Sequence, residues 1–160
     1  MNVFISYSVH DTGLVMLLAS QLGLQGHSVN WWSHSKEPGK EVWPQIFGWI
    51  DQADLVLAVI TDRTVGRAMS VGHEIGRAKA KGKMIMPLVS HDVDNRELGF
   101  LSSVTQIRFD PRNPWPAIME LQQHTKPVSI PAGGQQAASP GAALLVVGAL
   151  VLLAIGLSKE

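Results

Sequence analysis

The sequence contains no cysteine and has no excess of either charge. Without cysteine, the chain can form no disulfide, no cysteine-ligated zinc site and no thiol nucleophile. Its 13 basic and 13 acidic residues cancel, so no overall field favours a nucleic acid or an acidic partner. The six histidines are scattered, and we find no spacing typical of a metal site. Function must therefore depend on a few particular side chains.

Up to about residue 126, short apolar runs alternate with segments of helical periodicity. The apolar runs predict strands at 3–8, 27–32, 54–60, 83–89 and 104–109, and the periodic segments predict helices at 11–26, 41–53, around 70–81 and at 114–123. Asp11 is placed to cap the first helix, and Pro44 lies in the first turn of the second. Strands that alternate with helices form parallel sheets through right-handed crossovers. We therefore predict an α/β fold with a doubly wound, flavodoxin-like sheet of five parallel strands.

Polar residues follow two of these predicted strands. Ser6, Tyr7 and Ser8 come at the end of the first strand, and Thr61 comes directly after the third. In doubly wound sheets, ligands bind beyond the carboxyl ends of the strands, close to the point where the strand order reverses. We expect these residues to line such a crevice.

Glu74 is the only acidic residue in "SVGHEIGRAKAKGK", residues 70–83. One interpretation makes it a surface glutamate that pairs with Arg77, one turn further along the helix. The other places it at the ligand end of the sheet, because it lies early in the helix that follows the third strand. The local sequence does not decide between the two.

Four segments occur in a specific order over roughly residues 2 to 124. They are "VFISYS" followed by Asp11, "QGHSVNWWSHSKEPGK", "ADLVLAVIT" and "HEIGRAKAKGKMIMPLV". Together they resemble a Toll/interleukin-1 receptor (TIR) domain of the bacterial type, although any one of them would be a weak signal. The resemblance implies the TIR version of the flavodoxin-like sheet.

The resemblance also implies an activity and a set of site residues. Many TIR domains cleave NAD+ at the nicotinamide–ribose bond, with NAD+ as the substrate and no separate cofactor, and the catalytic glutamate of the family matches Glu74. The bond breaks through an oxocarbenium-like state, which a nearby carboxylate stabilises. Nicotinamide leaves as a neutral molecule, so no general acid is required. The substrate-binding residues implied by the same match are Tyr7, Ser8, Trp32, Glu37, Gly39 and Ser70.

Two positions depart from the family pattern. Ser70 stands where many enzymatic relatives carry a tryptophan, and Trp32 replaces the acidic residue that some relatives carry after the second strand. The ring of Trp32 could offer a stacking surface in place of the missing one. Trp31 and Trp32 should face opposite sides of the sheet, because side chains alternate along a strand. The absence of a ring at position 70 favours the alternative function, a non-catalytic adaptor that recruits other TIR proteins.

The C-terminal segment is uniformly apolar. Residues 142–157, "AALLVVGALVLLAIGL", carry no charged or hydrogen-bonding side chain, and as a helix they would span roughly 24 Å. A helix that is apolar on every side must be enclosed, either in a bilayer or in a protein core. We predict a transmembrane helix that contacts membrane lipid, with a core helix as the alternative.

This prediction divides the chain into a TIR domain at 1–126, a flexible linker at 127–141 and a single membrane span at 142–157. The domain would then lie on the cytoplasmic side of the cell membrane, where NAD+ is available. The resemblance implies homotypic TIR–TIR self-association and a role in bacterial defence signalling, and a membrane tether would raise the local concentration of copies. A pore formed by the tail is a third possibility, which the lack of polar residues disfavours.

Overall fold

The computed structural model describes residues 1–32, 41–65 and 68–126 of the 160-residue chain, with the side chains of 65 and 68–70 left out of the description. Five strands form one sheet in the order β2-β1-β3-β4-β5. The strands are β1 (Asn2–Ser6), β2 (Ser28–Trp31), β3 (Leu55–Ile60), β4 (Met84–Ser90) and β5 (Ile107–Phe109). Every neighbouring pair is parallel. The predicted α/β class and the five-stranded parallel sheet are confirmed.

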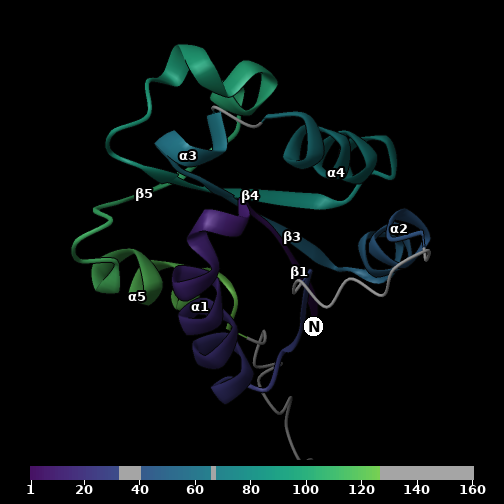
Figure 1. Ribbon diagram of the computed structural model, residues 1–160. Coiled ribbons are helices and arrows are strands. Elements are labelled where there is room, and N and C mark those ends of the chain that lie inside the picture. Colours follow the sequence, from purple (N-terminus) through teal and green to yellow (C-terminus); the bar gives the residue numbers. More distant parts are fainter. Residues whose placement is uncertain (33–40, 66–67, 127–160) are drawn as a thin grey trace, which may run out of the picture. The chain divides into compact units, whose positions relative to one another are not determined.

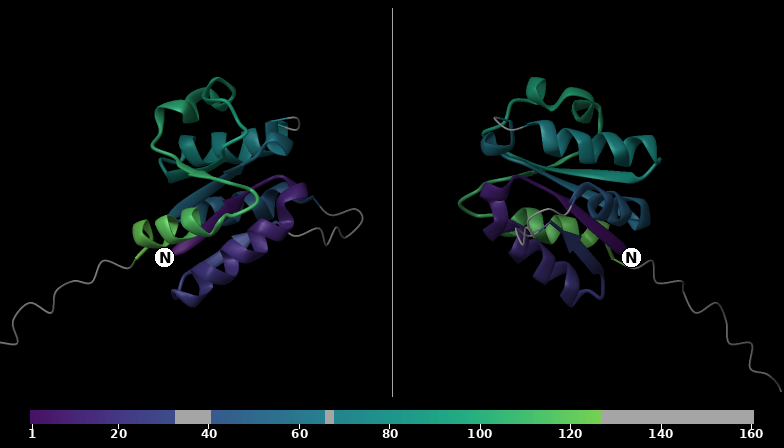
Figure 2. Two further views of the ribbon diagram at one scale, coloured as in Figure 1. Left: turned by 90° about the vertical axis from the view of Figure 1, so that its left-hand side faces the viewer. Right: turned by 45° about the vertical axis from the view of Figure 1, so that its right-hand side comes forward.

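Helices cover both faces of the sheet (Figures 1 and 2). The helices and short helical turns are η1 (Val9–Asp11), α1 (Thr12–Leu24), α2 (Trp43–Gln52), α3 (Asp62–Val65), α4 (Ala68–Ala80), η2 (Asn95–Ser103) and α5 (Trp115–His124). The apolar sides of α1 and α5 pack against one face, and those of α2 and α4 pack against the other. All six residues of β3 are buried, as expected for a strand enclosed from both sides.

The alternation of side chains along β1 decides which residues reach the candidate site. Val3 and Ile5 point into the core beneath α1 and α5, whereas Phe4 points into the core beneath α2 and α4. Because successive side chains alternate, Ser6 lies on the same face as Phe4. The last residue of β1 therefore points toward α4.

The sequence predicts the long elements and misses the short ones. The observed bounds of the predicted strands and helices differ by only a few residues, and Pro44 does lie in the first turn of α2. Trp31 and Trp32 pack on opposite faces of the sheet, as predicted. The short turns η1, α3 and η2 are not predicted, because three or four residues show no helical periodicity and η2 is broken by a non-helical backbone at Gly99.

The prediction that the Asp11 side chain caps the first helix is wrong. Asp11 does occupy the position before α1, but its side chain makes no capping hydrogen bond. Its Oδ2 atom instead accepts a hydrogen bond of 2.8 Å from the hydroxyl of Thr61, which directly follows β3. The tertiary partner takes the place of the local one, because the ends of β1 and β3 are neighbours in the sheet.

In the described part of the chain, no helix is both long enough and apolar enough to cross a membrane. The linker predicted at 127–141 and the membrane span predicted at 142–157 lie outside the described residues. Both remain predictions, as does the boundary of the TIR domain at residue 126.

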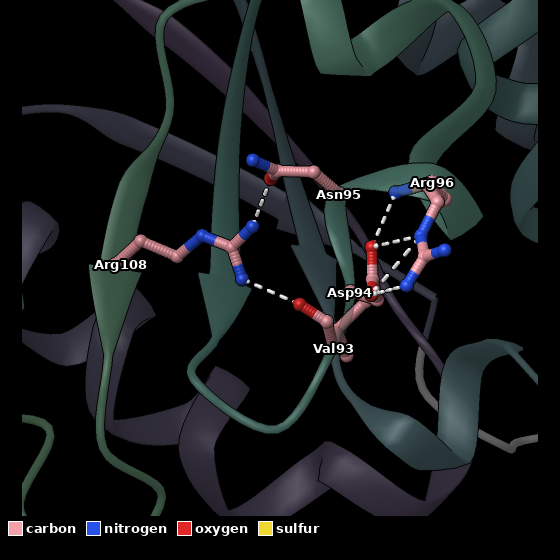
Figure 3. A network of polar contacts seen from close by, with 5 residues as sticks. All are labelled: Val93, Asp94, Asn95, Arg96 and Arg108. Atoms are coloured by element: carbon pink, nitrogen blue, oxygen red, sulfur yellow. Dashed lines mark hydrogen bonds and ion pairs between the residues drawn. The ribbon is translucent and has the colours of Figure 1, made fainter.

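The segment η2 is tied to the sheet by one arginine. The Arg108 guanidinium, on β5, donates hydrogen bonds to the backbone carbonyl of Val93 at 2.6 Å and to the side chain of Asn95 (Figure 3). It also donates to the carbonyl of Ser90 at 3.0 Å. These bonds fix the turn after β4, and so they fix the place where η2 begins.

We expect Arg108→Met to lower the free energy of unfolding by about 1–3 kcal/mol, because two carbonyl groups lose a charged donor. Urea denaturation would measure the change. Arg96→Met is the matched control, since Arg96 pairs with Asp94 at the surface and its side chain is 90% exposed. The control should show no measurable loss of stability. If Arg108→Met shows no measurable loss either, the role of Arg108 is contradicted.

Candidate active site

The strand order places the reversal of the sheet between β1 and β3. From β1 the chain first moves outward to β2, and it then crosses back to β3 on the other side of β1. At such a point the loops after the two central strands diverge to opposite faces and leave a crevice, where ligands bind in this class of sheet. Ser6 ends β1 and Thr61 follows β3, so both lie at this point.

Glu74 points into the protein at the carboxyl ends of the strands. Only 7% of the residue is exposed, and its Oε2 atom accepts a hydrogen bond of 2.5 Å from the hydroxyl of Ser6. Burial raises the pKa of the Glu74 carboxyl from 4.5 to about 7, and the hydrogen bond from Ser6 opposes part of that rise. A buried carboxyl group with a perturbed pKa at a sheet edge is typical of a functional site.

Arg77 does not pair with Glu74. Its guanidinium forms a two-pronged ion pair with Asp51 of α2, with Nε–Oδ1 at 3.0 Å and Nη2–Oδ2 at 2.5 Å. The Lys83 ammonium group adds a hydrogen bond of 2.7 Å to the backbone carbonyl of Asp51. The interpretation of Glu74 as a surface partner of Arg77 is therefore wrong.

Tyr7 and Trp32, which follow β1 and β2, are joined by one hydrogen bond. The Tyr7 hydroxyl donates a hydrogen bond of 2.5 Å to the backbone carbonyl of Trp32, which joins the ends of β1 and β2. Burial raises the pKa of Tyr7, an interaction with the Thr12 hydroxyl lowers it, and the nearby negative charge of Glu74 raises it further. The Tyr7 side chain belongs to the core beneath α1 and α5, whereas Glu74 lies on α4, on the opposite face of the sheet.

The aromatic ring of Trp32 already has a partner. It packs against Trp49 of α2 with ring centroids 6.4 Å apart, and it borders the apolar core on the α2 side. Ser8 is buried, and its hydroxyl has no hydrogen-bond partner within the described residues. The structure thus joins Tyr7 to Trp32 and Glu74 to Ser6, and Ser8 lies two residues after the end of β1.

Three of the predicted site residues have no described side chain. Glu37 and Gly39 lie outside the described residues, and Ser70 lies on α4 one turn before Glu74 without a described side chain. The described residues include no group of three or more acidic or histidine side chains that could hold a metal ion.

The sequence did not predict the bonds that organise this edge. Ser6 was expected to line the crevice, but its hydrogen bond to Glu74 joins residues 68 positions apart. Asp11 and Thr61 form a second link between the ends of β1 and β3, and the hydroxyl of Thr64 accepts a hydrogen bond of 3.2 Å from the backbone N–H of Thr61. A polar residue that ends an otherwise apolar strand, as Ser6 does, is the only sequence signal for these links.

We expect Glu74→Gln to stabilise the folded protein at pH 8 by up to about 3 kcal/mol. Between pH 4.5 and about 7 the unfolded chain ionises this side chain while the folded protein retains the proton. Stability therefore falls as the pH rises, and the full loss is present above pH 7. An amide has no charge to bury, so the variant escapes this loss.

Urea denaturation at pH 5 and pH 8 would measure this effect. The gain should be much smaller at pH 5. Glu120→Gln on the exposed side of α5 is the matched control and should show no gain at either pH. A Glu74→Gln variant with the same stability as the wild type at pH 8 would show that the carboxyl group is not buried.

Solved structures that resemble this chain share its fold at low sequence identity. The TIR domains of the activated Roq1 resistosome, which directly recognises the pathogen effector XopQ, are 13% identical with a TM-score of 0.62, and the match covers 76% of this chain and 97% of that one. The TIR domain of the Toll-related receptor TRR-2 from Hydra magnipapillata is 16% identical with a TM-score of 0.61, and the match covers 77% and 95%. At these identities the likeness shows the fold alone.

A third similar structure is described as an enzyme. The CMP N-glycosidase BcmB from Clostridium botulinum is 21% identical with a TM-score of 0.56, and the match covers 76% of this chain and 98% of that one. No protein of curated function matches the sequence. Residues 3–122 match the sequence model of the TIR domain, and this chain therefore belongs to the TIR-domain family.

Proposed function

We propose that this protein is a TIR-domain NAD+ nucleosidase that cleaves the nicotinamide–ribose bond, with Glu74 as its catalytic residue. The observation that carries the proposal is the burial of the Glu74 carboxyl group against Ser6, at the edge of the sheet where ligands bind. A carboxylate kept out of water destabilises the fold, and such groups are concentrated at functional sites. NAD+ is the substrate, and the proposal requires no cofactor.

The chemistry needs one negative charge beside the ribose. When the carbon–nitrogen bond breaks, its electron pair goes to the pyridinium ring, which leaves as neutral nicotinamide, and positive charge develops on the sugar. A fixed carboxylate stabilises that charge more strongly in a dry site than in water. Water then attacks the oxocarbenium-like sugar and loses a proton to the solvent, which completes the hydrolysis.

The hydrogen bond from Ser6 has two roles in this mechanism. It holds Oε2 of Glu74 in one direction, and it favours the ionised form of a group whose burial disfavours it. Because the pKa of Glu74 is about 7, roughly half of the carboxyl groups are ionised at neutral pH. The cationic nicotinamide ring of the substrate would favour ionisation further when it binds.

We further propose that residues 142–157 anchor the protein in the cell membrane as a single span, with the TIR domain in the cytoplasm. The support is the uncharged apolar run in the sequence. Homotypic TIR–TIR association on the membrane would bring neighbouring copies together, and bacterial defence signalling is the role that such an enzyme would serve. Loss of NAD+ or production of a nucleotide signal are both compatible with this chemistry.

Release of nicotinamide from NAD+ by the whole chain in lipid vesicles tests the proposed activity. We expect Glu74→Gln to lower the rate by at least about 100-fold, because the transition state loses its counter-charge. Glu120→Gln, an equally conservative change on the exposed side of α5, should leave the rate unchanged.

Equal rates for the wild type and Glu74→Gln would rule out the role of this residue. The protein is an adaptor instead if the wild type releases no nicotinamide even when densely packed on vesicles, while it still binds other TIR proteins. The serine at position 70, where many enzymatic relatives carry a tryptophan, is the feature that favours this second function.

A further inference from the structure

A cavity lies at the carboxyl ends of the strands, on the face of the sheet opposite Glu74. Its volume is about 520 Å³, within the range typical of small-molecule sites. The lining comes from η1, α1, the start of α3, the end of β5 and the segments that follow β3, β4 and β5, all of them described residues. Leu14 and Leu17 of α1 form part of the wall and border the core beneath α1 and α5, whereas Ser6 and Glu74 lie toward α4.

Part of the lining of this cavity is apolar. Phe109, only 2% exposed, lies among the lining residues together with the two leucines of α1. Pro111 and Pro114, which follow β5, complete this part of the wall. Such a surface favours the apolar body of a ligand, because contact between the two removes apolar surface from water.

The polar part of the lining carries more negative than positive charge. Three carboxylates, those of Asp11, Asp62 and Asp92, line the cavity together with the guanidinium of Arg63 and the imidazole of His10. The guanidinium donates a hydrogen bond of 3.2 Å to the backbone carbonyl of His10. The lining of the cavity thus combines acidic and apolar side chains.

Each of these carboxylates has one oxygen engaged within the described residues. Asp11 accepts from Thr61, Asp62 accepts from the N–H of Arg63, and Asp92 accepts from the hydroxyl of Ser90. The second oxygen of each has no partner in the described part of the chain, which leaves three acceptors for a ligand.

We propose that this cavity binds a small organic cation, with an amine or guanidine group against the carboxylates and an apolar body against Leu14, Leu17 and Phe109. A charged donor forms strong hydrogen bonds with such carboxylates. The same charges repel phosphates and carboxylates, so the site discriminates against anions of the same shape. The site is separate from Glu74 and does not rest on the proposed NAD+ cleavage.

Gly13 offers a way to fill the cavity without damage to the helix. It lies in the first turn of α1 and lines the cavity, and a Cβ atom added there meets no atom within 4 Å. Gly23, near the other end of α1, also has no atom within that distance and does not line this cavity. Gly13→Phe and Gly23→Phe are therefore matched variants.

The test compares phenethylamine with phenylacetate, two probes with the same ring and opposite charges, by saturation-transfer NMR on the whole chain. We expect phenethylamine to bind in the millimolar range and phenylacetate to give no signal. Gly13→Phe should weaken phenethylamine binding by at least about tenfold, and Gly23→Phe and Glu74→Gln should leave it unchanged. Asp62→Asn and Asp92→Asn should each weaken it severalfold.

The proposal is overturned if phenethylamine does not bind, if phenylacetate binds equally well, or if binding persists in Gly13→Phe. Thermal denaturation followed by circular dichroism checks that each variant folds. If Gly13→Phe does not fold, the double variant Asp62→Asn with Asp92→Asn decides, and undiminished binding there also overturns the proposal. Nicotinamide release plays no part in these outcomes, so they stand apart from the test of the proposed function.

Discussion

The hydrogen bond between Ser6 and Glu74 is the interaction on which the account of this protein depends. It joins the end of the central strand β1 to helix α4 and holds a carboxyl group where only 7% of the residue is exposed. Burial of an ionisable group destabilises a fold, and an apolar residue at position 74 would pack without that cost. The carboxyl group at this position therefore lowers stability, and the proposed catalytic role would explain why a glutamate is present.

The surrounding structure fixes α4, and with it Glu74, from two sides. Ile75, the next residue, packs against the core that η2 covers, and Arg108 anchors the start of η2 to the sheet. On the other side, Ala78 packs against α2, and Arg77 is bound to Asp51. A site on a helix held in this way keeps its geometry without a ligand, and such preorganisation is what electrostatic catalysis requires.

The sequence predicts most of this fold, because apolar periodicity is a local property that survives in the folded protein. It also places Glu74 near the ligand end of the sheet, since a helix after a parallel strand begins there. It does not predict the bonds of Ser6 or Asp11, whose partners are distant in the sequence and depend on the strand order. Asp11 illustrates the failure: local reasoning assigns its side chain to a helix cap, but its carboxylate accepts a hydrogen bond from Thr61, directly after β3.

Direct titration of the Glu74 carboxyl group is the sharpest test of this account. Carbon-13 NMR of the glutamate side chains, with Glu74→Gln to assign the signal, would follow its ionisation between pH 3 and pH 9 in the folded protein. The account predicts a midpoint near pH 7, because the carboxyl group is held out of water against Ser6. A midpoint near 4.5, the ordinary value for glutamate, would contradict the account, because it would show that the carboxyl group is not held out of water.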